Sequence, residues 1–307
     1  MSFRKNLFGF LPTWIIAIAA FVMLALSANG FTSENISNIL RGAFAHMCLL
    51  TGLALTIRSK GPDFSLILSM LLSGYVMGYI YQAGSSLAVS IGAGALTGIA
   101  CGAVTGVLTV YAKLHVVIVS AILGFGVKAG VTVVLAKKPP LPIAAMKTSN
   151  FTLLCVLICA AVLVIAVLLC TLSKKLRAPI SGRIKKDKSF MLFAAFPIAG
   201  GFAALAGAIM VLRLRMVVPQ IVTLNTVIFF LLAAMALMST KALDKGCFGV
   251  LYAAVLSFVY YTFVNGLVLN SINSYVQNVI LISILAVSFA VMIISNIGVH
   301  PKPWFRR

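Results

Sequence analysis

Acidic residues are the scarcest chemical group in this chain. Its 307 residues include four Asp and Glu against 24 Lys and Arg, and charged residues make up 9% of the sequence. Soluble domains carry about a quarter charged residues, so a soluble fold of this length is excluded. The same shortage leaves no pair of acids of the kind that binds metal ions for diphosphate chemistry.

The four acids also limit the ways in which the chain could use energy. Glu34, Asp63, Asp187 and Asp244 all fall between apolar stretches. A transporter driven by protons or sodium generally needs an acidic group inside the membrane. Ion coupling is therefore disfavoured, unless Asp63 dips into the membrane.

Motifs for nucleotide binding, catalysis and metal binding are missing as well. The sequence has no G-x-x-x-x-G-K-[ST] phosphate loop and no G-x-S-x-G elbow. Its six cysteines form no Cys-x2-Cys pair, and its three histidines are scattered. We therefore expect no metal, no cofactor and no enzymatic activity, and we expect any ATP hydrolysis to reside on a separate chain.

Apolar residues dominate what is present, at 62% of the sequence. A helix needs about 20 apolar residues to cross a bilayer core of about 30 Å, and ten runs approach that length. The sequence thus predicts an all-α integral membrane protein, with a single transmembrane domain over residues 1–307. The ten runs are 11–28, 39–57, 64–82, 87–112, 115–136, 151–172, 190–212, 221–238, 246–269 and 275–297.

Basic residues orient this bundle. With the N-terminus inside, 17 of the 24 Lys and Arg fall in cytoplasmic segments and six fall outside. This asymmetry follows the positive-inside rule and places both termini in the cytoplasm. The net charge of +20 is then a signal of topology and of attraction to anionic membrane lipids, and it is no evidence for nucleic-acid binding.

Glycines recur every fourth residue in the fourth run, so they share one helix face and let a neighbouring backbone approach closely. Packing within one subunit is the expected role, ahead of a dimer contact. The glycines of this run are Gly94, Gly98, Gly102 and Gly106. Two similar pairs in other runs are Gly74 with Gly78 and Gly126 with Gly130.

A Gly-Pro-Asp break between two apolar runs is the most unusual local feature. Unpaired backbone groups are not tolerated in hydrocarbon, so Gly61, Asp63 and Ser65 must lie at the water boundary or line a polar cavity. In the first case Asp63 caps the next helix in a cytoplasmic turn. In the second, the helix N-terminus faces a translocation path. Lys128, the one cation inside a run, either snorkels or faces a cavity or interface.

Four ordered stretches carry a resemblance to a known family. They are Phe-Thr-Ser-Glu-Asn-Ile-Ser-Asn-Ile-Leu at 31–40, Gly-Pro-Asp-Phe-Ser at 61–65 with Ser-Gly at 73–74, the Ala-Gly-Gly-rich helix at 198–207, and Asn-Gly-Leu-Val-Leu at 265–269 with Tyr-Val-Gln at 275–277. The chain resembles the inner-membrane permease subunits of ABC importers for ribose-type sugars and nucleosides. The branched-chain amino-acid permeases are more distant relatives.

This resemblance implies a type II ABC importer fold and ATP-driven import of a simple sugar or nucleoside. It implies as partners a second permease subunit, two ATP-binding cassette subunits and a solute-binding protein, in the cytoplasmic membrane of a prokaryote. Gly61, Asp63, Ser65, Lys128 and Asn265 are then candidates for the translocation path. A secondary transporter, or a channel-like membrane subunit without an ATPase, is the alternative.

The chain also departs from the family. The cytoplasmic segment that contacts the ATPase in the family is here a short basic stretch, and the Gly-Gly pair before the ninth run is absent. We therefore favour a heterodimer, in which the partner permease keeps the fuller coupling segment. The coupling candidates in this chain are Lys175, Arg177, Arg183, Lys185 and Lys186.

A stiff, basic outer connection follows the fifth run. Lys137 and Lys138 precede three prolines within four residues, and this suits docking of a binding protein with an acidic rim. Arg213 and Arg215 could assist from another outer segment. The alternative is a solvated loop whose lysines face lipid headgroups.

Overall fold

The structure is a computed structural model that describes residues 2–27, 30–137, 140–143, 148–175, 185–218, 222–239 and 248–297. Helices account for nearly all of these residues, and two π-helical turns (η1 and η2) continue helices without a break. The elements are α1 (Ser2–Leu26), α2 (Ser33–Ser59), α3 (Ser65–Gln82), α4 (Leu87–Gly106), η1 (Val107–Tyr111), α5 (Val116–Ala121), η2 (Ile122–Val127), α6 (Lys128–Ala136), β1 (Leu141–Pro142), α7 (Thr148–Lys175), α8 (Lys185–Leu214), β2 (Met216–Val217), α9 (Leu224–Ser239), α10 (Phe248–Leu269) and α11 (Ser274–Ile297).

Each of the ten predicted runs corresponds to a helix or to one continuous helical stretch. Within the described residues, seven helices are long and apolar enough to cross a membrane, and three shorter apolar helices lie at 13–26, 224–238 and 274–290. The predicted all-α membrane fold is therefore confirmed.

The second helix extends beyond its predicted run. It begins at Ser33 rather than at residue 39, because its polar first turn is capped. The hydroxyl of Thr32 accepts a hydrogen bond from the backbone N–H of Asn35 at 3.3 Å, which satisfies a donor that the helix itself leaves free. Hydropathy alone misses this polar turn.

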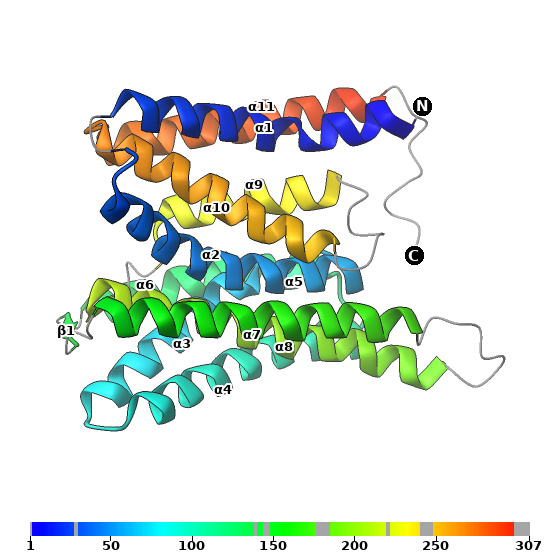
Figure 1. The fold of residues 1–307 in the computed structure, drawn as a ribbon. Helices are drawn as coiled ribbons and strands as arrows, with labels where there is room; N and C mark the ends of the chain where they lie inside the picture. The colour runs from blue at the N-terminus through cyan, green and yellow to red at the C-terminus, as the bar shows by residue number, and fades with distance from the viewer. Residues whose placement is uncertain are drawn as a thin grey trace.

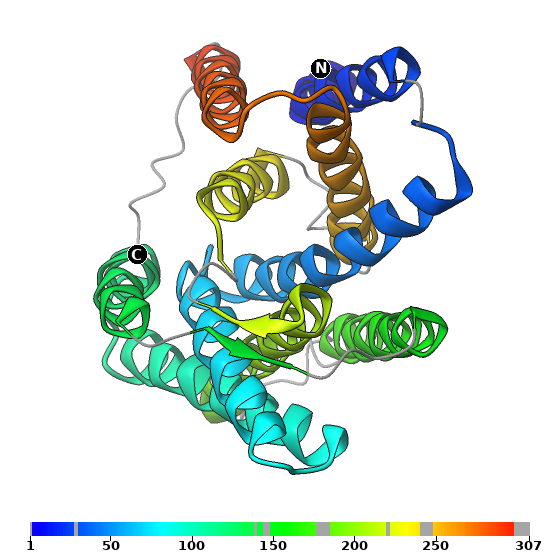
Figure 2. The ribbon, with the colours of Figure 1, turned by 90° about the vertical axis from the view of Figure 1, so that its left-hand side faces the viewer.

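Helix α2 forms the centre of the bundle. Figure 2 shows it passing between α10 on one side and α8 on the other, and it also contacts α7 and α9. Leu49, Leu50 and Leu53 of α2 are fully buried. Its long apolar stretch is thus covered by protein on several sides.

Helices α3, α4 and α8 pack together through glycines. A Cβ atom added to Gly98 would lie 2.4 Å from the carbonyl oxygen of Gly200, and one added to Gly200 would lie 2.2 Å from that of Gly98. Gly94 approaches the carbonyl oxygen of Ser73 on α3 in the same manner. The predicted packing of this glycine face within one subunit is confirmed.

The pair Gly126 and Gly130 behaves differently. No described atom lies within 4 Å of a Cβ added at either position. The stretch from α5 to α6 packs mainly on α3 through η2, so these two glycines lie on a face that the described part of the chain leaves uncovered. The expectation that they resemble the fourth-run glycines was wrong, because their face points away from α3.

Different segments lie at the two ends of the helix bundle (Figure 1). Strands β1 and β2 pair antiparallel, with Leu141 opposite Val217 and Pro142 opposite Met216. This pairing lies at the end where α2 begins. Helix α7 ends, and α8 begins, at the opposite end, where α1 also begins and α11 ends.

We predict that Gly200→Ala destabilises the protein by about 1–3 kcal/mol, because the added methyl group overpacks a contact between two backbones. The measurement is the thermal or denaturant unfolding midpoint of the purified protein in detergent. Gly92→Ala on α4 is the matched control, since nothing lies within 4 Å of its added Cβ. Equal midpoints for Gly200→Ala and the wild type would contradict the prediction.

Candidate functional site

The turn between α2 and α3 has a backbone conformation that favours glycine. Gly61 has a φ of 144°, a region that side chains other than hydrogen rarely allow. A Cβ atom at this position would also lie 2.9 Å from Cγ1 of Val116. Gly61 therefore lets the chain reverse close against the start of α5.

Asp63 lies two residues before the start of α3 and is fully buried. Its Oδ1 accepts hydrogen bonds from the backbone N–H of Ser65 at 2.9 Å and from the Ser65 hydroxyl at 2.6 Å. Both residues are at most 1% exposed. Asp63 thus satisfies a donor at the helix N-terminus, as a capping residue does, but it does so in the protein interior.

Helical segments far along the chain enclose this turn. A Cβ added to Gly124 of η2 would lie 2.1 Å from the Phe64 carbonyl oxygen. The Phe64 ring contacts Phe125 at 5.5 Å and Phe230 at 6.1 Å between centroids, and the Ser120 hydroxyl donates to the Pro62 carbonyl at 3.4 Å. The sequence left open whether this turn meets water or lines a polar cavity. In the structure, the chain's own helices surround it.

Buried hydroxyl groups continue from Asp63 along α3, α4 and η1. The hydroxyls of Ser65 and Thr105 lie 2.8 Å apart. Ser69 donates to the Ser65 carbonyl at 3.2 Å, and Thr109 donates to the Thr105 carbonyl at 2.8 Å. Sequence reasoning missed this polar seam, although the spacing of Ser65, Ser69 and Ser73 every fourth residue was a usable signal.

The second carboxylate oxygen of Asp63 has no partner. Oδ2 is buried, and no described residue hydrogen-bonds to it. Burial raises the pKa of Asp63 from 3.8 to about 6, while the hydrogen bonds from Ser65 act in the opposite direction. Asp63 is therefore an enclosed acid that can change its charge near neutral pH.

Lys128 lies apart from this turn along the stretch from α5 to α6. It shares a helix face with Gly124, the residue that packs on the turn, and it is half-buried. The structure gives its ammonium group no hydrogen bond or ion pair with a described residue. A half-buried cation on an apolar span is costly without polar surroundings, so its role in the path stays a prediction.

Asn265 lies at the opposite end of α2 from Asp63. Its side-chain N–H donates to the Asn35 side-chain oxygen at 2.7 Å, and its own oxygen accepts from Asn38 at 3.4 Å. The Asn38 oxygen accepts from Arg213 at 3.2 Å. The structure thus joins a path candidate, Asn265, to a docking candidate, Arg213, and separates both from the Asp63 turn.

The proposed docking residues gather at the end with the strands. The backbone carbonyl of Arg215 accepts from Ile143 at 2.9 Å, which ties the segment after Lys137 to the end of α8. Lys137 and Arg215 are exposed, whereas Arg213 is half-buried. Lys138 lies outside the described residues.

The coupling candidates belong to the opposite end. Lys175 ends α7, and Lys185 and Lys186 begin α8. Arg177 and Arg183 lie outside the described residues. The described ends of these two helices therefore bring three of the five candidates to one side of the bundle (Figure 1).

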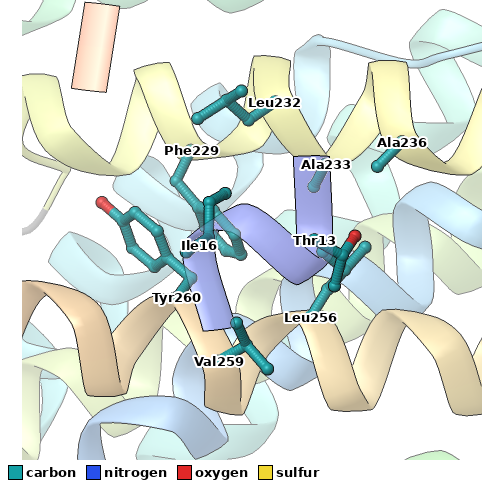
Figure 3. A pocket seen from close by; sticks show the side chains of 9 residues that line it. All are labelled: Thr13, Ile16, Phe229, Leu232, Ala233, Ala236, Leu256, Val259 and Tyr260. Atoms are coloured by element: carbon teal, nitrogen blue, oxygen red, sulfur yellow. The ribbon is translucent and has the colours of Figure 1, made fainter. Parts of the chain in front are cut away.

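Among the described residues, the cavity between α1, α9 and α10 is too small for a substrate. Figure 3 shows Phe229 of α9 and Tyr260 of α10 converging on Ile16 of α1 around a cavity of about 10 Å³. A cavity of about this size holds one water at most. In the part of the chain that the structure describes, no three His, Cys, Asp or Glu side chains are grouped to hold a metal ion.

Comparison with known proteins finds a partial similarity to sugar-import permeases. The chain is 30% identical over 139 residues to the ribose import permease protein RbsC of Escherichia coli (strain K12), and the match covers 43% of each chain. Over this segment the chain is homologous to a sugar-import permease. The same protein from two further Escherichia coli strains matches equally well.

The chain thus matches less than half the length of these relatives. No family model and no solved structure matches it. The resemblance predicted from the four sequence stretches is nevertheless confirmed, as a similarity to a ribose import permease over part of the chain. The relatives are import permeases, and the expectation of a transport subunit rather than an enzyme agrees with them.

We predict a pH dependence that Asp63→Asn abolishes. Because the folded pKa of Asp63 is raised, the folded state holds its proton more tightly than the unfolded chain does. Its stabilising contribution is present below pH 3.8 and is lost as the pH rises through about 6, by about 3 kcal/mol at most. Unfolding midpoints of wild type and Asp63→Asn, measured at about pH 4.5 and about pH 7.5, should diverge in favour of the variant at the higher pH.

Glu34→Gln is the control for this experiment, since Glu34 is an exposed acid in the first turn of α2. Its midpoint should follow the wild type at both pH values. If the difference between wild type and Asp63→Asn stays constant with pH, Asp63 does not titrate in this range and the prediction fails.

Proposed function

We propose that this chain is the permease subunit of an ATP-driven, binding-protein-dependent importer of a small polar solute, a simple sugar or a nucleoside. The 30% identity to a ribose import permease over 139 residues carries this proposal. The seven long apolar helices support it, as does the scarcity of acids that an ion-coupled transporter would use.

The translocation path in this proposal runs between two permease subunits. Gly61, Asp63 and Ser65 lie toward its inner end, and Asn265 lies toward its outer end. Lys128 lies on the stretch from α5 to α6, whose other face is left uncovered by the described part of the chain. A second subunit packed on that face would cover Gly126 and Gly130 and close the path. We favour a different permease as this partner, because the coupling segment of this chain is short.

The two ends of the bundle then have different partners. The end with β1 and β2 faces outward, and a solute-binding protein docks there on Lys137, Lys138, Arg213 and Arg215. The opposite end faces the cytoplasm of a prokaryotic cell, with both termini on that side. Two ATP-binding cassette subunits contact the junction of α7 and α8 there.

An ion-coupled transporter is the second candidate, and one observation favours it. Asp63 is a buried acid whose pKa is raised to about 6, within the range where a proton could be taken up and released during transport. The proposed ATP-driven importer does not require this titration. The two candidates therefore differ in the driving force that transport needs.

Uptake in proteoliposomes separates these functions. The chain is co-reconstituted with the ATP-binding, binding-protein and permease products of its neighbouring genes, and radiolabelled ribose and nucleosides serve as solutes. We expect uptake that requires ATP and the binding protein and that persists without ion gradients. Uptake by the isolated chain under a proton gradient, abolished in Asp63→Asn, would instead establish the second candidate.

We further predict that Lys185→Glu combined with Lys186→Glu lowers ATP-driven uptake by roughly tenfold or more, because reversed charges repel a docking partner that basic residues attract. The initial uptake rate and the co-purified ATPase subunit report the effect. Lys113→Glu, a basic residue in the connection before α5, serves as the control. Wild-type uptake by the double variant would remove these residues from the coupling contact.

A further inference from the structure

A cavity of about 380 Å³ opens at the end of the bundle that carries β1 and β2. It lies between the start of α2, the start of α7 and the end of α8. Cavities of about 300 Å³ or more accommodate small organic ligands, so this one is large enough for a small solute. Its lining residues are Asn38, Arg41, Phe151, Leu212, Arg213, Leu214 and Arg215.

Three of the residues that line this cavity are arginines. None of Arg41, Arg213 and Arg215 forms an ion pair with a carboxylate among the described side chains. Three uncompensated positive charges around one recess attract anions and repel cations. The cavity is therefore a site for a negatively charged group, and a neutral sugar would leave these charges unpaired.

Arg213 is held in place for such a ligand. Its Nη2 donates to Asn38 at 3.2 Å and also to the Tyr261 hydroxyl, while its Cζ lies 4.9 Å from the Tyr261 ring centroid. The ring can lie there because position 42 is glycine, since a Cβ at Gly42 would overlap it. No described residue hydrogen-bonds to Nε or Nη1 of Arg213. These two donors are available on a positioned side chain.

Arg41 has a donor that the described residues leave unsatisfied. Its Nη2 donates to the Ser37 hydroxyl at 2.6 Å, but its Nε is buried and has no partner among the described residues. Enclosed donors without partners are rare, because losing water without a replacement costs free energy. Arg41 also lines the cavity, so an oxyanion bound there would place a negative charge beside its guanidinium group.

We propose that this cavity binds the phosphate group of a small molecule. Arginine forks match the oxygens of phosphate through paired N–H···O bonds, and three positive charges suit a dianion better than a single carboxylate. Because the donors are recessed, a small ligand reaches them more easily than the broad surface of a docking protein does. A free phosphorylated solute and the headgroup of an anionic lipid share this chemistry. The inference does not rest on ATP-driven import.

The test uses the full chain in phosphatidylcholine nanodiscs at low ionic strength. Ribose 5-phosphate and inorganic phosphate are titrated by calorimetry, with ribose as the uncharged probe. We expect saturable binding of both phosphate probes, no binding of ribose, and affinity that falls with added salt. Arg41→Gln and Arg213→Gln should each weaken binding at least tenfold, and Arg213→Lys should weaken it less, because it keeps the charge and loses the fork.

Two further variants keep the test decisive. Arg215 is exposed at the cavity rim, so Arg215→Gln should fold normally, as its unfolding midpoint would show, and should bind phosphate more weakly. Lys113→Gln removes a positive charge outside the cavity lining and should bind as the wild type does. Equal binding by folded Arg213→Gln, Arg215→Gln and wild type would overturn the proposal, as would the absence of binding by both phosphate probes.

Lipid composition distinguishes the two sources of phosphate. In nanodiscs that contain phosphatidylglycerol, competition that weakens ribose 5-phosphate binding and depends on Arg41 would identify a lipid headgroup as the occupant. Unchanged binding would identify a soluble phosphorylated ligand. Because these measurements use the isolated chain, their outcome is independent of the uptake experiment.

Discussion

The backbone contact between Gly98 of α4 and Gly200 of α8 sets the spacing of one half of the bundle. Two helices can approach this closely only where neither carries a side chain at the contact. Helix α3 packs on both of them, and its hydroxyl-lined face meets α4 there. The buried polar seam from Asp63 to Thr109 therefore depends on a spacing that small residues allow.

Polar groups in this chain follow one rule, which is that backbone and side-chain donors in a membrane must be satisfied by the protein itself. The asparagines at the start of α2 pair with Asn265 of α10, and Ser65 pairs with Asp63 and Thr105. Among the described residues, five buried side-chain atoms are exceptions: Oγ1 of Thr51, Oδ1 of Asn225, Oδ1 of Asn278, Oδ2 of Asp63 and Nε of Arg41. Only the Asp63 and Arg41 atoms belong to ionisable groups, and these two lie toward opposite ends of α2.

Charge is also separated along the bundle. The end where α2 ends holds an enclosed acid in the turn that follows, and the end that carries β1 and β2 holds three arginines around a cavity. Neither group is neutralised by an ion pair among the described side chains. Such isolated charges cost stability in a compact membrane protein, and this cost is the physical reason for assigning them to function rather than to packing.

Sequence alone determined the class of the protein. Ten apolar runs, a shortage of acids and an uneven distribution of Lys and Arg predicted a polytopic membrane bundle, and four short stretches pointed to the permease family before any comparison. These signals are local, because a membrane span must be apolar along its whole length. The helix face shared by Gly94 and Gly98 was predictable for the same reason.

Only the tertiary structure decided which of these residues meet. The enclosure of Asp63 depends on Gly124 and Phe230, which lie far along the chain, and the arginine cavity unites the start of α2 with the end of α8. Gly126 and Gly130 repeat the spacing of packed glycines and yet remain uncovered. Spacing along a helix fixes a shared face, but which neighbour covers that face depends on how all the helices pack at once.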